Sequence, residues 1–356
     1  MRVLIVGGGI SGLLSAYELS GSGHHVTLLD RREVGREASW AGGGILTPLK
    51  PWEAPEPVMR LVRWSWRRYP ELVGEVERES GIDPEFWRCG LLWIGVPPEI
   101  AKTLPSGRWL SKGAVAEALP GLAEPKGGVF SPEIAQVRNP KLLQALKVAL
   151  SRRGVALLER TPVVGWRIER GRIAGVETNR GIFSADLYLL AAGAWSRKLL
   201  EGFGVSLPEI WPAKGQMLLF EAPGWLDRMV MAGDHYLIPR RDGKLLVGST
   251  VEVSEVPLPT ADALRKLHRF ALSLFPRLRR APLIAQWAGL RPAAPRGIPY
   301  IGRHPEIPNL YLNCGHFRNG VVMAPASARL VVDLMEGRPP IVEPKPFDPA
   351  LRMARS

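Results

Sequence analysis

The residues with the clearest chemical implication are the glycines of the GGGISG motif at residues 7–12. The motif follows a short apolar run, residues 2–6, and precedes apolar residues at helical spacing. In such a strand–turn–helix unit Gly7 allows a tight turn, Gly9 lets the backbone approach a pyrophosphate, and Gly12 lets helix and strand pack closely. The N-terminus of the helix would hold the pyrophosphate. The pattern therefore predicts a dinucleotide-binding turn.

An acidic residue completes this unit. Residues 26–29 form a second apolar run that ends in Asp30. A carboxylate at the end of the second strand is placed to accept hydrogen bonds from an adenosine ribose. The unit predicts a dinucleotide but does not choose between NAD and FAD.

A second glycine-rich segment follows at residues 35–44. It ends in three consecutive glycines, Gly42, Gly43 and Gly44. Such glycines let the chain pass close to a flat ligand or present successive N–H groups to it. The alternative is a mobile surface loop.

The elements around these motifs predict two intertwined domains. A helix is expected at residues 58–79, and Asn139 is expected to cap a helix that has Pro140 at its first position and continues over residues 141–152. Short strands separated by turns are expected at 85–137 and 207–290, and a closing helix at 320–336. We predict an α/β fold (α+β overall) with a nucleotide-binding domain of parallel sheet and helices at 1–82, 139–204 and 297–356. Residues 83–138 and 205–296 form a second domain with a mixed or antiparallel sheet.

Composition narrows the function classes. The chain has 356 residues and a net charge of +13, but its basic residues occur in scattered pairs such as Arg240 and Arg241, so we expect no nucleic-acid partner. No stretch is long and apolar enough to span a membrane, and we predict a cytoplasmic protein. The two cysteines, Cys89 and Cys314, lie in no ligand cluster, so no metal site is expected. Scarce Asn and Gln and an excess of Arg over Lys are compatible with a thermophilic source.

Six motifs, taken in order along nearly the whole chain, resemble the D-amino-acid oxidase superfamily of FAD enzymes. They are residues 7–12 with Asp30, residues 39–44, residues 189–193, the GLRP segment at 289–292, the PYIG segment at 299–302, and the GHFRNG segment at 315–320. Within the superfamily the chain is most similar to the glycine oxidases of thiamine biosynthesis. The resemblance implies a Rossmann-like, glutathione-reductase-like FAD domain and a substrate domain, with the active site where they meet.

The resemblance also implies which residues hold FAD. Those in the N-terminal half are Gly7, Gly9, Ile10, Ser11, Gly12, Asp30, Arg31, Arg32, Glu37, Ala38, Ser39, Gly42, Gly43 and Gly44. Val163 matches the position whose backbone meets the adenine, and Ala192 and Gly193 follow. His316, Phe317, Asn319, Gly320, Val321 and Val322 match the stretch that closes over the flavin ring, with the N-terminus of the following helix directed at a flavin carbonyl. Taken alone, His316 would be a turn histidine with satisfied hydrogen bonds, and the motif makes a role beside the flavin an equally good interpretation.

Substrate contacts are implied in the same way. Arg291 matches the arginine that binds the amino-acid carboxylate, Arg318 matches a second arginine of the glycine oxidase site, and Tyr236 matches a tyrosine whose hydroxyl also reaches the carboxylate. Taken alone, Arg291 would be a surface ion-pair residue and Tyr236 a core aromatic residue.

The sequence departs from the family at two points. Asp30 stands where many relatives have glutamate. Trp40 is large where glycine oxidases tend to have a small residue, so the size of the substrate can differ from theirs. Neither cysteine lies where related enzymes attach their flavin covalently, so we expect noncovalent FAD.

Three functions compete at this point. The first is oxidative deamination of glycine, sarcosine or a small D-amino acid, with hydride transfer to flavin N5, an imino acid hydrolysed to the 2-oxo acid, and O₂ reduced to H₂O₂. The second is a dye- or quinone-linked dehydrogenase subunit for proline or another amine. The third is a basic flavoprotein that binds RNA. For the first we expect a small amino-acid substrate, O₂ or another electron acceptor, and a homo-oligomer.

Overall fold

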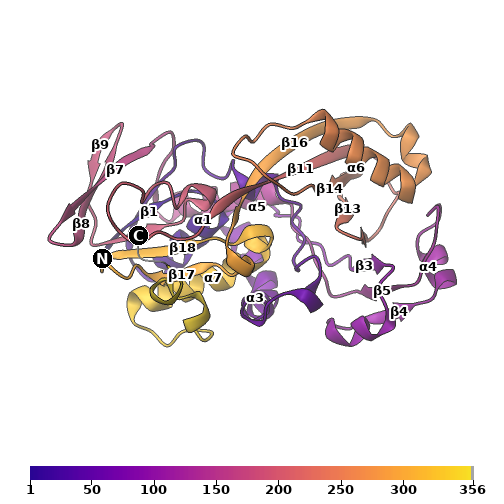
Figure 1. Cartoon of the computed structure of the whole chain (residues 1–356), viewed down its shortest axis with the longest axis horizontal. Helices are drawn as coiled ribbons and strands as arrows, with labels where there is room; N and C mark the ends of the chain where they lie inside the picture. The colour runs from indigo at the N-terminus through magenta and orange to yellow at the C-terminus, as the bar shows by residue number, and fades with distance from the viewer. Residues whose placement is uncertain (354–356) are drawn as a thin grey trace.

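A computed structural model describes residues 1–353 of the chain (Figure 1). Its described part contains a six-stranded, a nine-stranded and a three-stranded sheet. The six-stranded sheet lies at one end with both chain termini, and the nine-stranded sheet lies at the other (Figure 1). Among the described residues no helix is both long and apolar enough to cross a membrane.

The six-stranded sheet has the order β17-β18-β10-β1-β2-β6. Its strands are β1 (Arg2–Val6), β2 (His25–Leu29), β6 (Ala156–Leu158), β10 (Leu187–Leu190), β17 (Tyr300–Arg303) and β18 (Leu310–Cys314). All neighbours pair in parallel except β17 and β18. The prediction of a parallel sheet is therefore wrong at this edge, because the short connection between β17 and β18 cannot make the long crossover that parallel strands need.

Helices cover one face of this sheet. They are α1 (Ile10–Gly21), α5 (Asn139–Arg152) and α7 (Gly320–Glu336), and α3 (Glu56–Ser80) packs on α5 and α7. Val3 and Ile5 of β1 pack into the core under these helices. The intervening Leu4 and Val6 pack on the opposite face, so the strand is apolar on both sides, as a buried parallel strand must be.

A small antiparallel sheet covers that opposite face. It consists of β7 (Val163–Glu169), β8 (Arg172–Thr178) and β9 (Gly181–Phe183). Trp166, Ile173 and Val176 of this sheet share a core with Leu4, Val6 and residues of β10. The nucleotide-binding end thus has three layers.

The nine-stranded sheet is mixed, as predicted. Its strands are β3 (Leu91–Ile94), β4 (Arg108–Leu110), β5 (Gly128–Ser131), β11 (Trp211–Glu221), β12 (Met229–Ala232), β13 (His235–Pro239), β14 (Lys244–Gly248), β15 (Glu252–Val253) and β16 (Leu283–Ala293). Only β3 and β12 pair in parallel within it. Its strands all come from 83–138 and 205–296, whereas the six-stranded sheet draws on the other three segments; the division into two domains with these boundaries stays a prediction.

The two faces of the nine-stranded sheet have different neighbours. One packs against α6 (Ala261–Leu274), with α4 (Lys112–Ala118) nearby. The other carries Tyr236 and Ile238 of β13 and packs against residues 45–66, which follow the glycine-rich loop. Alternation along β13 therefore directs Tyr236 toward the nucleotide-binding segments.

The remaining elements are short. They are α2 (Ala38–Ala41), α8 (Pro349–Arg352) and the 3₁₀ turns η1 (Pro51–Glu53), η2 (Pro98–Thr103), η3 (Gly193–Trp195), η4 (Pro276–Arg280), η5 (Pro295–Gly297), η6 (Phe317–Asn319) and η7 (Lys345–Phe347).

The start of α5 corrects one prediction. Arg138 occupies the N-cap position and Asn139 is the first helical residue. The Asn139 side chain does not cap the helix; its Nδ2 donates to the carbonyl oxygen of Ser39 at 2.7 Å. A tertiary contact with α2 has replaced the local cap.

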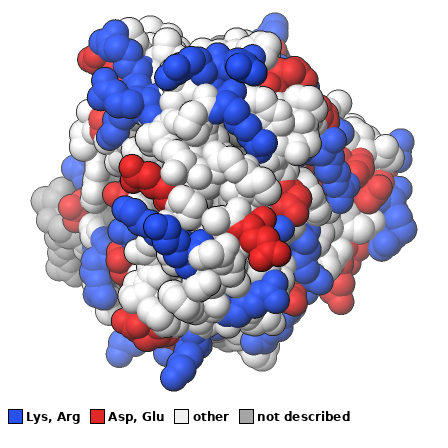
Figure 2. Space-filling model, turned by 90° about the vertical axis from the view of Figure 1, so that its right-hand side faces the viewer, with Lys and Arg blue, Asp and Glu red and all other residues white. Residues whose placement is uncertain are grey.

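Charged side chains of both signs are mixed on the face formed by the nine-stranded end. Figure 2 shows lysines and arginines interspersed with acidic residues around an uncharged centre. The positive net charge is therefore not gathered into a single continuous patch on this face.

Candidate active site

A cavity of about 640 Å³ runs between the glycine-rich turn and the strands that carry the predicted substrate residues. Its volume is typical of sites for small molecules and cofactors. Of the predicted residues, the cavity wall contains Gly7, Gly9, Ile10, Ser11, Asp30, Arg31, Glu37, Ala38, Ser39, Gly42, Val163, Ala192, Gly193, Arg291, His316, Phe317, Arg318, Gly320 and Val321. Residues more than three hundred positions apart thus meet at one cavity.

The glycine turn has no room for side chains. Gly7 adopts φ +112°, and a Cβ there would lie 2.4 Å from the carbonyl oxygen of Ala191. A Cβ on Gly12 would lie 1.9 Å from the carbonyl oxygen of Gly7, so the first turn of α1 presses directly on the end of β1. At Gly9 a Cβ would come within 3.2 Å of Ser39 Oγ. The turn leaves the N-terminus of α1 open to the cavity, where an anion is favoured.

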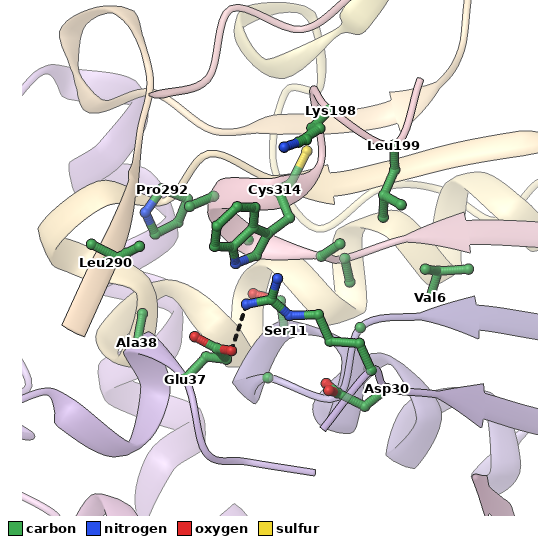
Figure 3. A pocket seen from close by; sticks show the side chains of 18 of the residues that line it. Val6, Ser11, Asp30, Glu37, Ala38, Lys198, Leu199, Leu290, Pro292 and Cys314 are labelled. Carbon is green, nitrogen blue, oxygen red and sulfur yellow. Dashed lines mark hydrogen bonds and ion pairs between the residues drawn. The ribbon is translucent and has the colours of Figure 1, made fainter. Parts of the chain in front are cut away.

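Asp30 is held by the backbone of this turn. One carboxylate oxygen accepts from the Gly8 N–H and the other from the Arg32 N–H, each at 2.8 Å. Burial raises the pKa of Asp30, and these two hydrogen bonds oppose the rise. Asp30 still lines the cavity (Figure 3), and each oxygen keeps a further lone pair for a ribose hydroxyl. The shorter acid therefore retains the acceptor that the prediction requires.

Arg31 lines the cavity and joins two of its segments. Its Nη2 donates to Glu37 Oε1 at 2.7 Å, the interaction dashed in Figure 3. Its guanidinium also lies over the Trp195 ring, 4.1 Å from the centroid. This arrangement joins the segment after β2 to η3. The sequence analysis missed Trp195. Its position two residues after Gly193 was the only feature that pointed to it.

The glycine-rich loop is tied to α1 and α5. Ser39 Oγ accepts from the Ile10 N–H at 2.9 Å, and the Ser39 carbonyl accepts from Asn139. A Cβ on Gly42 would lie 2.9 Å from Asn139 Nδ2, and one on Gly44 would lie 2.0 Å from the Val137 carbonyl oxygen. The loop is thus packed and hydrogen-bonded, not a mobile surface loop. Asn139 belongs to this site, although the sequence pointed only to a helix start.

Gly43 of the glycine-rich loop lies against strand β13. A Cβ on Gly43 would lie 2.8 Å from Ile238 and 3.4 Å from the Tyr236 hydroxyl. Trp40, in the same loop, packs edge-on against Trp287, with ring centroids 5.6 Å apart, and is not among the residues of the cavity wall. Its large ring is accommodated outside the cavity.

Arg291 lies on β16 and lines the cavity. Its Nη1 donates to the Thr250 carbonyl at 3.1 Å and its Nη2 to Ser249 Oγ at 2.9 Å. The guanidinium rests on Gly215 of the paired strand, where a Cβ would lie 2.1 Å from it. Burial lowers the pKa of Arg291, Arg318 lowers it further, and the Tyr236 hydroxyl beside it raises it. The structure therefore brings the three predicted substrate residues together.

No acid compensates these two arginines. In residues 1–353 neither Arg291 nor Arg318 forms an ion pair, and the buried Nε of Arg318 has no hydrogen-bond partner there. The Tyr236 hydroxyl lies beside Arg291 and 3.5 Å from the sulfur of Met217, and neither neighbour is an acid. The site thus has cationic donors without an acidic partner and a hydroxyl beside them, which suit an anionic ligand.

His316 is not a turn histidine with satisfied hydrogen bonds. Its side chain is 2% exposed, and its Nε2 has no partner within the described residues. Burial lowers the pKa of His316 to about 4, so the imidazole is neutral at physiological pH. It lines the cavity next to Arg318 without adding charge.

Seven predicted residues lie off the cavity wall. Gly12, Arg32, Gly43, Gly44, Asn319 and Val322 adjoin wall residues in the chain, and Tyr236 lies behind Gly43. Wall residues that the sequence analysis missed include Thr161, Lys198, Leu199 and Asn313, together with Cys314, named there only as a cysteine without ligand partners. Burial raises the pKa of Cys314 to about 12, so this thiol is not a nucleophile. No group of three or more potential metal ligands occurs in the part of the chain that the structure describes.

These features fit FAD. Glycines keep side chains out of the turn, the N-terminus of α1 faces the phosphate region, and Asp30 has an acceptor for the ribose. A family model described as "FAD dependent oxidoreductase" (DAO) matches residues 2–334. The chain belongs to this family of FAD-dependent oxidoreductases, as predicted.

Three known proteins show which members of the family this chain is similar to. Glycine oxidase of Pseudomonas putida is 45% identical over 362 residues, covering 99% of each chain. The bifunctional protein ThiO/ThiG of Trichormus variabilis is 36% identical over 349 residues, which are 94% of this chain and 52% of that protein. The crystal structure of glycine oxidase from Geobacillus kaustophilus superposes with a TM-score of 0.91 at 31% identity and covers 98% of both chains. The predicted fold class is therefore confirmed.

Proposed function

We propose that this protein catalyses the FAD-dependent oxidative deamination of a small amino acid such as glycine, sarcosine or a small D-amino acid. The cavity residues would hold FAD noncovalently, and FAD would supply the hydride acceptor for the substrate Cα–H. Water would hydrolyse the resulting imino acid to the 2-oxo acid and ammonia, or methylamine when the substrate is sarcosine. O₂ would take up the two electrons and become H₂O₂. The similarity to glycine oxidases over the full chain supports this proposal.

The observation that carries the proposal is the uncompensated Arg291. Its guanidinium is fixed by Ser249 and Thr250 but has no acidic partner among residues 1–353. A planar guanidinium binds a carboxylate through two parallel hydrogen bonds. The Tyr236 hydroxyl would donate to the same carboxylate, and Arg318 would add positive potential beside it. The substrate is thereby oriented by its carboxylate.

Chemistry at this site depends on orientation and exclusion of water. Aligning the Cα–H bond with its acceptor removes much of the entropic cost of a reaction between two partners. A neutral His316 and a protonated Cys314 leave the carboxylate as the main charge for the arginines to bind. No acid–base pair is needed for the hydride step itself.

A substrate panel tests the proposal. The purified yellow protein is mixed with glycine, sarcosine, D-alanine and L-proline while peroxide and dye reduction are followed in parallel. Peroxide formed from glycine or sarcosine supports the oxidase. Dye reduction much faster than oxygen reduction, with L-proline as the best substrate, would instead identify a dehydrogenase.

The biological setting is proposed on the same basis. A role in thiamine biosynthesis rests on the resemblance to the protein named ThiO/ThiG. Assembly into a homo-oligomer, a cytoplasmic location and a thermophilic source remain predictions from the sequence.

A further inference from the structure

Helix α7 contains a proline in its second turn. Pro325 is the sixth residue of the helix. Because proline has no N–H, the helical hydrogen bond from residue 325 to the carbonyl of Val321 cannot form. The Val321 carbonyl is consequently free to accept a hydrogen bond from another group.

Helix α3 supplies the replacement. The Tyr69 hydroxyl donates to the Val321 carbonyl oxygen at 2.5 Å. Four residues earlier on the same face of α3, Ser65 Oγ accepts from the Ala326 N–H at 3.2 Å. Tyr69 is 1% exposed and Ser65 is fully buried, so water does not compete for these groups. Two side chains of α3 therefore flank the proline and satisfy the backbone groups on both sides of it.

The first turn of α7 is part of the cavity wall. Gly320 and Val321 both line the cavity. The N–H groups of a helix's first turn have no partners within the helix and carry partial positive charge, which stabilises an anion placed before them. A shift of this turn would change how strongly it stabilises negative charge in the cavity.

We infer that Tyr69 is a positioning residue, which replaces the hydrogen bond removed by Pro325 and so holds the first turn of α7 against the flavin. Tyr69 acts only through Val321. The inference rests on FAD occupying the cavity, but not on the identity of the amino-acid substrate. It assigns to α3 a role in setting the electrostatic environment of the cofactor.

Burial keeps this hydroxyl a donor. It raises the pKa of Tyr69 above its ordinary value, so the group stays protonated over the working range of pH. The hydrogen bond to Val321 is thus insensitive to pH.

The test compares Tyr69→Phe, Pro325→Ala and the double variant. Two probes need no substrate: FAD titrated into the deflavinated protein, and sulfite, which adds to oxidised flavin and leaves the ring negatively charged. Tyr69→Phe is expected to weaken sulfite binding about two- to five-fold, the size of a helix-terminus effect. In the double variant the new N–H at position 325 can bond to the Val321 carbonyl, so sulfite affinity should return to within about two-fold of the original protein.

Tyr17→Phe is the matched control. It also removes a buried hydroxyl, which donates to Glu79 near the end of α3 at 2.7 Å, but this hydroxyl does not contact α7. The control should lower stability without changing sulfite binding. An unchanged sulfite affinity in Tyr69→Phe, or equal weakening in Tyr69→Phe and the double variant, overturns the inference.

Poor folding of Tyr69→Phe would not prevent the test. The double variant must then fold and bind FAD and sulfite like the original protein, and its failure to do so refutes the inference. A substrate panel that yields no amino-acid oxidation would refute the proposed function. It would not affect the results on FAD and sulfite binding.

Discussion

The guanidinium of Arg240 donates from Nη2 to the carbonyl oxygen of Gly43 at 2.8 Å. Its Nη1 also donates to Gln136 Oε1 and to the Val137 carbonyl. Arg240 thus joins the end of β13, which carries Tyr236, to the glycine loop predicted to contact FAD. Burial lowers the pKa of Arg240 to about 10, which leaves it charged at neutral pH.

Arg240→Gln should weaken both FAD and substrate binding. The substitution leaves buried carbonyl groups of Gly43 and Val137 without their donor, and we expect a loss of about 2–4 kcal/mol in the free energy of unfolding. FAD affinity is measured by titration of the deflavinated protein. Arg241→Gln is the control. The Arg241 side chain is exposed and donates to the Asp83 carboxylate and the Phe86 carbonyl, away from the glycine-rich loop. Equal effects of the two substitutions would contradict a specific role for Arg240.

Arg291→Ala should raise the apparent KM for glycine about 10- to 100-fold. This range corresponds to the loss of a charge-assisted hydrogen-bonded pair. Arg291→Lys should recover only part of the loss, because an ammonium group cannot make the two parallel hydrogen bonds. Arg172→Ala, an exposed change on β8, is the control. The carboxylate role is wrong if Arg291→Ala binds glycine and sarcosine as tightly as the original protein does.

Protonation of His316 should destabilise the protein in acid. Its pKa is lowered from the ordinary 6.5 to about 4, so between these values the unfolded chain binds a proton that the folded chain does not. The contribution of neutral His316 to the free energy of unfolding is therefore complete above pH 6.5, and it is lost as the pH drops toward 4. The contribution lost between pH 7 and pH 4.5 is about 2 kcal/mol.

Chemical denaturation at these two pH values measures this loss. His316→Asn, which cannot be protonated, should lose about 2 kcal/mol less than the original protein over the same interval. The comparison removes the contribution of other groups that titrate in this range. Parallel losses in the two proteins would show that His316 does not titrate as described.

Gly12→Ala should prevent FAD binding or folding. The added methyl would meet the Gly7 carbonyl oxygen at 1.9 Å, and because this contact is with backbone it leaves little room to relax. Gly74→Ala in α3 is the matched control, because its nearest contact would be 3.4 Å, with a flexible arginine side chain. The control should be neutral or stabilise the helix by up to about 1 kcal/mol. Flavin content and thermal unfolding distinguish the two, and a yellow, stable Gly12→Ala protein would refute the packing argument.

The sequence alone determined the local features whose causes are local. Gly7, Gly12 and Asp30 follow from the fixed spacing of a strand, a turn and a helix, because each acts within about twenty residues of the others. The helix predicted at 58–79, which spans Glu56–Ser80 in the structure, also follows from periodicity. The roles of Arg291, Arg318 and Tyr236 came from the family motifs and not from their spacing.

Only the tertiary structure decided the contacts between distant segments. Asn139 bonds to Ser39, Arg240 to Gly43 and Tyr69 to Val321, with sequence separations of 100, 197 and 252. No periodicity or propensity encodes such pairs, because each depends on how two elements pack after folding. Pro325 can be read from the sequence. The Tyr69 hydroxyl that replaces its missing hydrogen bond lies on α3, and only the folded chain places α3 beside α7.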